Sequence, residues 1–440
     1  MTKSYISPVY MMSSGYGYSR PVGEYSADTL NSFSVSLLDF GKTLNENNRP
    51  DLSGLDLQAM DFRLPGYPML IFAVYKLTGE PIVRNMSIFQ ALISSFFPLL
   101  FYLIAILLTG QNVSLSLIAT WIYALYPPLI YPSTNVLPGC IATGFLLLAI
   151  YFLLRAIKNG SIYSILLCGI FIGVSTYFRS TALHIWVFIG FGLFWMTKRF
   201  LSSLKFAFII GISSYLLLTP WAKFNYDNWG RWTYGSSASW CTIWECIGEF
   251  DNPWGVIRDD NYANKVAMAN GFKDRATFKA NDWFKNQVKS YVKENPIFFI
   301  KATMKRLPLV IAAPYETGYK NPYREKGIYS YFGNKEKLTP FQILLKHPDY
   351  VIKAYWERLL VMLISFFGFI STLIITIRFR KKYPLFLLVS SIMLYYVLLH
   401  TLTNPNPRYF TILIPFQILG ILVFLFEIFE SDRFHLFRPK

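Results

Sequence analysis

The stretch at residues 137–158, LPGCIATGFLLLAIYFLLRAIK, decides the class of fold. It carries no charged side chain before Arg155, and about 20 mostly apolar residues are enough to cross the hydrocarbon core of a bilayer. Arg155 and Lys158 close the stretch, and basic residues gather in this way at the cytoplasmic ends of membrane spans. We therefore expect a membrane-spanning helix here.

The composition extends this expectation to the whole chain. Of its 440 residues, 53% are hydrophobic, 18% are aromatic and only 15% are charged, whereas a soluble domain carries roughly a quarter charged residues. The aromatic content excludes a disordered chain, and four cysteines are too few for a disulfide scaffold. The net charge of +17 comes without a basic helix interleaved with base-stacking aromatics, which argues against nucleic acid and suits anionic lipid headgroups.

Nine segments are long and apolar enough to predict an all-α polytopic membrane protein. We place these spans at 87–108, 113–133, 137–157, 161–178, 181–197, 203–221, 357–377, 383–402 and 408–428. Basic clusters follow the third, fifth and seventh spans and end the chain: Arg155 and Lys158; Lys198, Arg199 and Lys205; Arg378, Arg380, Lys381 and Lys382; Arg433, Arg438 and Lys440. Because these positions alternate correctly, all of them fall in the cytoplasm at once.

This topology divides the chain into four parts. They are an external N-terminal segment (1–86), a six-span region (87–221), a large external loop (222–356) and a three-span region with a cytoplasmic tail (357–440). Since the first 20 residues lack the apolar core of a signal peptide, we expect a further span ahead of them.

Two charged residues of the N-terminal segment are candidate functional groups. Asp28 begins a predicted amphipathic helix at 26–41, and capping that helix is the leading explanation for Asp28 taken by itself. Arg63 precedes Pro65-Gly66-Tyr67-Pro68, and the two prolines stiffen the backbone around it. Anchoring at the membrane surface is the alternative explanation for Arg63.

Two further arginines lie on the external side, against the positive-inside rule. Arg179 occupies the short turn after the fourth predicted span, and Arg408 opens the last one, close to His400 at the end of the eighth. Charged groups near the membrane mark functional sites often enough to be tested as such. We expect one external acid and three external arginines to converge above one helical bundle.

The order of these pieces resembles the GT-C glycosyltransferases, in particular the branch of the protein O-mannosyltransferases and aminoarabinose transferases. Six pieces carry the resemblance: Asp28 to Gly41; Arg63 to Pro68; Ala124 to Ile130; Thr219 to Trp221 with Asn225, Gly230 and Arg231; Glu294 to Pro296; and Arg408-Tyr409 with Pro415. Lys223 and Phe224 depart from the family pattern, and Leu137-Pro138-Gly139-Cys140 stands where the family often has an acid.

The resemblance implies an inverting transfer of sugar from a polyprenyl or dolichyl phosphate to an acceptor hydroxyl on the external face. It implies Asp28 as the base, with Glu24 in reserve, and Arg63, Arg179 and Arg408 as ligands of the donor phosphate. Tyr67, His400 and Tyr409 are additional candidate site residues. The resemblance assigns no particular cofactor, no metal-ligand set is visible in the sequence, and a divalent cation is compatible with the site.

The large loop carries other features with two explanations each. Pro296 to Leu307 repeats Pro348 to Leu359 in proline, isoleucine, lysine, alanine, arginine and leucine, which predicts two helices lying on the membrane or arises by chance. Cys241 and Cys246 are compatible with a disulfide in an external loop. Three nearby tryptophans suit either sugar stacking or the membrane interface: Trp240, Trp244 and Trp254.

Two other function classes stay open. A polysaccharide polymerase or ligase shares the many spans and the large loop, and a transporter or flippase of a lipid-linked sugar shares the spans and the basic outer face. The absence of repeated spans argues against the transporter. The acceptor is open among proteins, glycolipids and polysaccharides, and a bacterial cytoplasmic membrane is the expected location.

Overall fold

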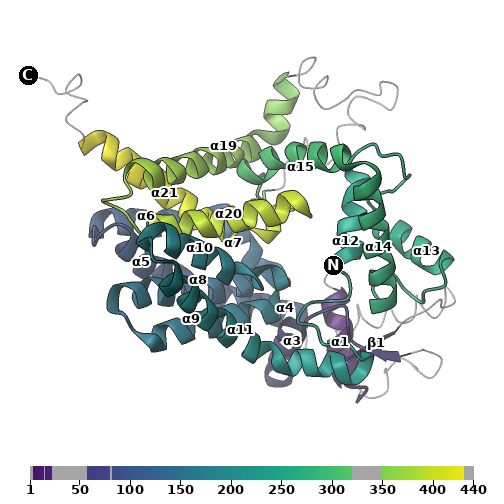
Figure 1. The fold of residues 1–440 in the computed structure, drawn as a ribbon. Helices are drawn as coiled ribbons and strands as arrows, with labels where there is room; N and C mark the ends of the chain where they lie inside the picture. The colour runs from purple at the N-terminus through teal and green to yellow at the C-terminus, as the bar shows by residue number, and fades with distance from the viewer. Residues whose placement is uncertain (1–2, 14, 22–56, 80–81, 320–347, 431–440) are drawn as a thin grey trace, which may run out of the picture.

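The computed structural model describes residues 3–13, 15–21, 57–79, 82–319 and 348–430. Helices dominate these residues (Figure 1). The predicted Asp28, Glu24 and amphipathic helix 26–41 lie outside the described residues, so nothing further is said of their structure.

Six helical segments in the described part are long and apolar enough to cross a membrane. They are α4 and α5 together (Ile82–Ser94 and Phe97–Leu108), α8 (Gly139–Asn159), η2 and α10 together (Ser180–Ala182 and Ile185–Thr197), α11 (Phe200–Trp229), α19 (Pro348–Arg378) and α21 (Leu413–Glu430). A seventh follows if α6 (Val113–Leu125) and α7 (Pro127–Thr134), bent by 46°, form one span. The described helices are therefore those of an integral membrane protein.

Two shorter apolar helices complete the bundle: α9 (Ile162–Phe178) and α20 (Phe386–Leu402), of 17 residues each. Every predicted span thus coincides with a helix or a pair of helices. The first span begins earlier than predicted, at Ile82, and α11 continues past residue 221 to Trp229, where Gly230 adopts a left-handed conformation (φ 65°) and ends it.

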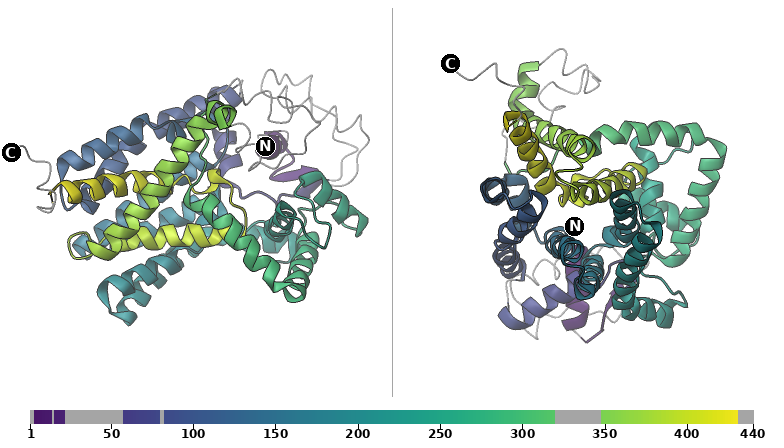
Figure 2. Two further views of the ribbon diagram at one scale, coloured as in Figure 1. Left: turned by 90° about the horizontal axis from the view of Figure 1, so that it is seen from above. Right: turned by 60° about the vertical axis from the view of Figure 1, so that its left-hand side comes forward.

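One buried apolar cluster joins these helices into a single core. It contains Phe101 of α5, Leu147 of α8, Ile172 of α9, Ile189 of α10 and Phe416 of α21, all at most 2% exposed. Figure 2 shows the long helices running side by side, with the teal and green helices of the large loop at one end of the bundle and the C-terminal end of α21 at the other.

The N-terminal segment corrects the all-α prediction in one detail. Helix α1 (Lys3–Ser13) packs on α3 (Gly66–Thr78) through buried residues that include Val9 and Ile71. Between them, β1 (Ser19–Pro21) pairs antiparallel with β2 (Leu57–Ala59), so that Ser19 faces Ala59. Both strands are three residues long, too short for period-two hydrophobicity to reveal them.

The large loop folds around an apolar core of its own. It contains α12 (Ser239–Glu245), η3 (Cys246–Glu249), α13 (Asp260–Ala269), α14 (Phe278–Glu294) and α15 (Pro296–Ile311). Its buried cluster includes Cys241, Trp244, Ala263, Phe284 and Val288, and Figure 1 shows α12, α13 and α14 together at one end of the molecule. We call this unit the external helical cluster, after the side of the membrane on which the sequence analysis predicts the large loop.

The two copies of the internal repeat both begin helices at their prolines. Asn295 caps α15, its Oδ1 accepting a hydrogen bond from the Phe298 N–H (3.1 Å), and Pro296 takes the first turn. The second copy starts α19 at Pro348. It is not a separate helix lying on the membrane, because α19 continues without a break to Arg378 and contains a candidate span at Ile352–Arg378.

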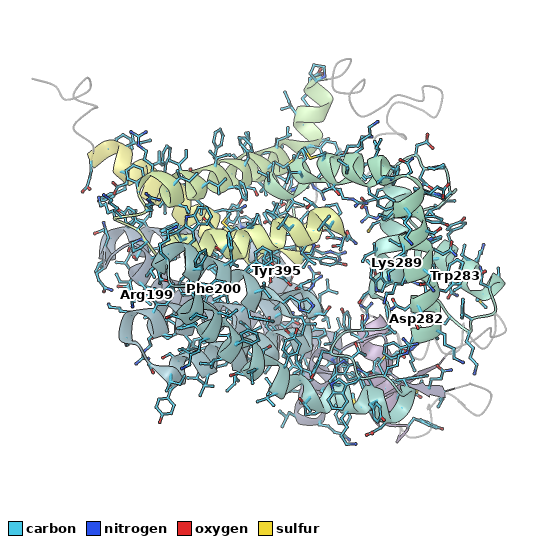
Figure 3. All side chains as sticks on the ribbon, viewed as in Figure 1. Arg199, Phe200, Asp282, Trp283, Lys289 and Tyr395 are labelled. Carbon is cyan, nitrogen blue, oxygen red and sulfur yellow. The ribbon has the colours of Figure 1, made fainter. Side chains whose placement is uncertain are left out.

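Side chains mark the two ends of the bundle. Figure 3 shows Arg199 and Phe200, where α10 gives way to α11, at the end opposite to Asp282, Trp283 and Lys289 of α14. The external helical cluster and the basic turn at Arg199 therefore lie at opposite ends.

Candidate functional site

Arg179 and Arg408 meet at the end of the bundle that carries the external helical cluster. Arg179 caps the C-terminus of α9, and Arg408 lies in η4 (Pro407–Tyr409), just before α21. The Arg179 Nη1 donates to the backbone carbonyl of Arg408 (3.1 Å) across 229 positions of sequence. The predicted convergence of these two arginines is thus present in the geometry.

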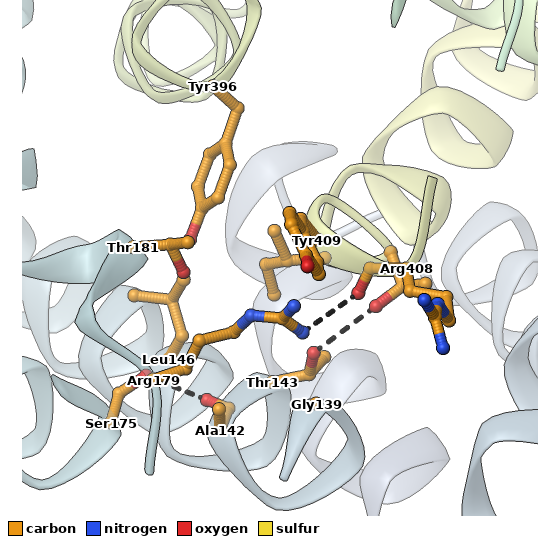
Figure 4. A pocket seen from close by; sticks show the side chains of 12 residues that line it. Gly139, Ala142, Thr143, Leu146, Ser175, Arg179, Thr181, Tyr396, Arg408 and Tyr409 are labelled. Atoms are coloured by element: carbon orange, nitrogen blue, oxygen red, sulfur yellow. Dashed lines mark hydrogen bonds between the residues drawn. The ribbon is translucent and has the colours of Figure 1, made fainter. Parts of the chain in front are cut away.

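The two arginines line one pocket, which is drawn in Figure 4. Its wall is rich in hydroxyl groups and small residues: Gly139, Ala142, Thr143, Leu146, Ser175, Arg179, Thr181, Tyr396, Arg408, Tyr409, Thr411 and Ile412. Such a wall offers hydrogen-bond donors and positive charge to a small anionic group.

Glycine at position 139 makes room for the Arg179 guanidinium. A Cβ built on Gly139 would lie 3.1 Å from the Arg179 Nη1 and 3.6 Å from the Arg408 carbonyl oxygen. This is the stretch where the GT-C resemblance led us to look for an acid. In this chain, the small residue at position 139 leaves space for the Arg179 side chain.

Tyr409 holds the Arg179 guanidinium from its other side. The guanidinium carbon lies 3.9 Å from the centre of the Tyr409 ring, a distance typical of a cation–π contact. In the described part of the chain, Arg179 forms no ion pair with a carboxylate, and its side chain contacts the Arg408 carbonyl and the Tyr409 ring. Its positive charge is therefore oriented but not neutralised by this part of the chain.

His400 lies behind Tyr409 and does not line the pocket. It is buried, with its ring centre 5.7 Å from that of Tyr409 and 5.1 Å from that of Phe410. Its Nδ1 lies 2.9 Å from the carbonyl oxygen of Asn404, and because a carbonyl only accepts, the Nδ1 carries the proton. This candidate site residue supports the turn rather than facing a ligand.

Arg63 is the third predicted arginine, and it does not line the pocket. Its guanidinium carbon lies 4.0 Å from the ring centre of Phe62 and 4.6 Å from that of Tyr5. Arg63 therefore packs against an aromatic ring of the N-terminal helix α1.

Gly66 brings the Arg63 segment against the end of α9. A Cβ at Gly66 would lie 2.8 Å from the carbonyl carbon and oxygen of Tyr177, two residues before Arg179. The next residue, Tyr67, is fully buried, and its hydroxyl donates to Gln90 of α4. Tyr67 therefore fixes α3 in the fold and offers nothing to a ligand.

An ion-pair network that the sequence analysis missed joins the N-terminal segment to the external helical cluster. Arg20 contacts Asp61 (3.0 Å) and Asp274 (2.7 Å), and donates to the Ala276 carbonyl (3.2 Å). Burial raises the pKa of Asp61, which is fully enclosed, although Arg20 opposes this effect. Asp61 lies two residues before Arg63, and this proximity is the one feature of the sequence that could have pointed to Asp61.

Cys241, Cys246 and Trp244 of the large loop are buried, whereas Trp240 and Trp254 are only partly buried and pack against the same apolar cluster. All four cysteines of the chain are buried free thiols, and burial raises the pKa of Cys241 and of Cys246 to about 12. Trp244 is 3% exposed and stacks on Tyr262. These residues are explained by packing.

No group of three or more histidine, cysteine, aspartate or glutamate side chains within the described residues is arranged to hold a metal ion. The chain matches no protein-family model, and no curated protein matches it in sequence.

Proposed function

We propose that the chain is a membrane-embedded inverting glycosyltransferase that moves a sugar from a polyprenyl-phosphate donor to an acceptor hydroxyl. The proposal rests chiefly on one observation, the meeting of Arg179 and Arg408 at a hydroxyl-lined pocket next to the apolar bundle. A phosphate attached to a lipid needs such a site, because its head is anionic and its tail stays among apolar helices.

The geometry around Arg179 suits a bound phosphate, because no carboxylate of the described residues pairs with its guanidinium. One of its five N–H groups is engaged by the Arg408 carbonyl, and the rest of the planar fork is available to bind two oxygens at once. Tyr409 lies over the flat face of the guanidinium, so the fork is directed before a ligand arrives. Preorganised donors of this kind stabilise charge that develops on a leaving group.

In the proposed reaction the acceptor oxygen forms a bond to the anomeric carbon while the bond from that carbon to the phosphate oxygen breaks. Arg179 and Arg408 hold the departing phosphate, and Arg63 acts from the neighbouring α3 segment. Asp28, with Glu24 in reserve, takes the proton of the acceptor hydroxyl as general base. A single displacement inverts the anomeric centre.

The membrane arrangement is part of the same proposal. A 17-residue helix is about 26 Å long and falls at the short end of the spanning range of roughly 17–25 residues, so α9 and α20 complete a nine-span bundle. The basic turn at Arg199 and the external helical cluster lie at opposite ends (Figure 3), which supports the predicted orientation with the pocket on the external side. A bacterial cytoplasmic membrane is the proposed location.

A binding measurement tests the proposal without an acceptor. The purified chain in lipid nanodiscs is titrated with a polyprenyl phosphate and, separately, with the uncharged polyprenol of the same length. We expect the phosphate to bind at least about tenfold more tightly, since one charge-assisted hydrogen bond contributes about 1.5–3 kcal/mol. The Arg179→Ala and Arg408→Ala variants should lose that preference.

Arg155→Ala is the matched control. Arg155 is an exposed arginine at the other end of α8, the helix that starts at the pocket. Its removal should leave phosphate binding unchanged. Equal affinity of the folded wild type for the phosphate and the alcohol would overturn the donor hypothesis and favour a polymerase or a transporter.

A further inference from the structure

Two arginines of the external helical cluster contact residues just before Arg408, and one carboxylate, Glu249, binds both of them. Glu249, at the end of η3, forms ion pairs with Arg258 and with Arg306 of α15, the latter at 2.6 Å. The side chains of Glu249 and Arg306 are 8% and 6% exposed, whereas that of Arg258 is 43% exposed. One enclosed acid thus fixes two arginines.

Both arginines also bind the residues that lead into the pocket turn. Arg306 donates through Nη1 to the carbonyl of Thr401 (3.5 Å), near the end of α20. Arg258 donates through Nη2 to the side-chain oxygen of Asn404 (3.1 Å). Glu249 therefore orients two donors that reach across to residues 401–404.

The connection continues from Asn404 to Arg408. The Asn404 carbonyl accepts the Nδ1–H bond of His400 (2.9 Å). Two residues later, the side-chain oxygen of Asn406 accepts from the backbone N–H of Arg408 (3.2 Å) and from its Nε (3.3 Å). Pro405 and Pro407 flank Asn406 and restrict the backbone of the turn.

We propose that Glu249 is a positioning residue that couples the external helical cluster to the Arg408 side of the pocket. This inference rests on the proposed function, because it assigns the pocket a phosphate ligand. With Glu249 in place, Arg258 and Arg306 hold residues 401–404, and Asn406 presents the Arg408 guanidinium.

The test is a double-mutant cycle with polyprenyl phosphate as the probe. Glu249→Gln keeps the shape of the side chain and removes its charge. We expect it to weaken phosphate binding about tenfold in the wild-type chain and by less than about twofold in the Arg408→Ala background, because the effect passes through Arg408. Equal losses in both backgrounds would overturn the proposal, since a general loss of structure does not depend on Arg408.

Two variants keep the result interpretable. Glu245→Gln removes another enclosed acid of the same cluster, one that pairs with Arg275 inside the loop, and it should leave phosphate affinity unchanged. Arg258→Gln removes only the half-exposed partner and its bond to Asn404. It should reproduce part of the loss if Glu249→Gln fails to fold, and wild-type affinity for this variant would count against the proposal.

Hydrogen exchange separates failure of this inference from failure of the proposed function. Glu249→Gln should speed amide exchange in residues 401–409 about tenfold by loosening that turn, whereas Glu245→Gln should not. If the wild type binds no polyprenyl phosphate, the proposed function falls and the exchange result decides the coupling alone. Unchanged exchange in residues 401–409 would overturn the coupling.

Discussion

Replacing Gly66 by alanine tests whether the close contact between α3 and α9 organises the site. The added Cβ would lie 2.8 Å from the carbonyl carbon and oxygen of Tyr177 and 2.9 Å from its Cβ. Two of these three atoms belong to the backbone of α9, so no side-chain rotation relieves the overlap. The start of α3 must move away from the end of α9.

The expected cost follows from two opposing effects. Forcing an extra methyl group into a packed contact costs about 1–3 kcal/mol, while alanine in place of glycine in a helix recovers roughly 0.5–1 kcal/mol. The difference lies between about 0 and 2.5 kcal/mol, so Gly66→Ala should destabilise the chain by about 1 kcal/mol. Because Arg63 lies three residues before Gly66 and Arg179 two residues after Tyr177, phosphate binding should weaken by up to about tenfold, or 1.4 kcal/mol.

Stability in detergent micelles, followed by denaturant titration, and polyprenyl-phosphate binding in nanodiscs measure the two effects. Gly235→Ala is the matched control, because a Cβ there meets no atom within 4 Å and should change neither quantity. The reasoning would be refuted if Gly66→Ala were as stable as Gly235→Ala and bound phosphate equally well, since the helices would then not depend on this contact.

The remaining predictions concern charge and oxidation. Arg179→Lys keeps a positive charge without the planar fork, so its phosphate affinity should fall between wild type and Arg179→Ala in the same titration. Mass spectrometry after unfolding and alkylation should find Cys241 and Cys246 as free thiols, and a disulfide-linked peptide would contradict their buried, unpaired state. Burial raises the pKa of Glu245 to about 7 despite its ion pair with Arg275. The raised pKa of Glu245 therefore contributes fully to the free energy of unfolding below about pH 4.3, and this contribution is lost as the pH rises through about 7. Denaturant titrations should find this loss in the wild type and not in Glu245→Gln.

The membrane helices were predictable because hydrophobicity over about 20 residues is a local property. Each predicted span overlaps a helix. The errors lie at the ends of the spans, where the helix extends beyond the apolar residues. Helix α11 continues to Trp229 because nothing in residues 222–229 breaks it before the glycine at position 230. Hydropathy reports where a helix is apolar and not where it stops.

The external helical cluster shows what the sequence analysis overlooked. We predicted residues 222–356 only as a large external loop, yet Ala280, Phe284 and Val288 recur every four residues and are all buried in its core. That spacing predicts an amphipathic helix. The pairing of Ser19–Pro21 with Leu57–Ala59 was beyond reach, since it joins two three-residue segments that no local pattern connects.

The members of the candidate site were predictable only in part, and their roles were not. A lone arginine in an external turn is visible in the sequence, and two such arginines, Arg179 and Arg408, share the pocket. Arg63, Tyr67 and His400 carried equal weight in the sequence, yet they stand beside or behind it. Which of these residues faces a ligand depends on packing between elements far apart in the chain.

The surroundings of Arg179 argue for an anionic ligand more directly than the family resemblance does. A carbonyl oxygen and an aromatic ring orient a guanidinium without cancelling its charge. In the described part of the chain no carboxylate pairs with Arg179, and a second arginine lies beside it. Near a membrane such an arrangement costs free energy, which a bound phosphate offsets and an uncharged polyprenol does not. Comparing these two lipids therefore tests the charge of the ligand separately from its apolar tail.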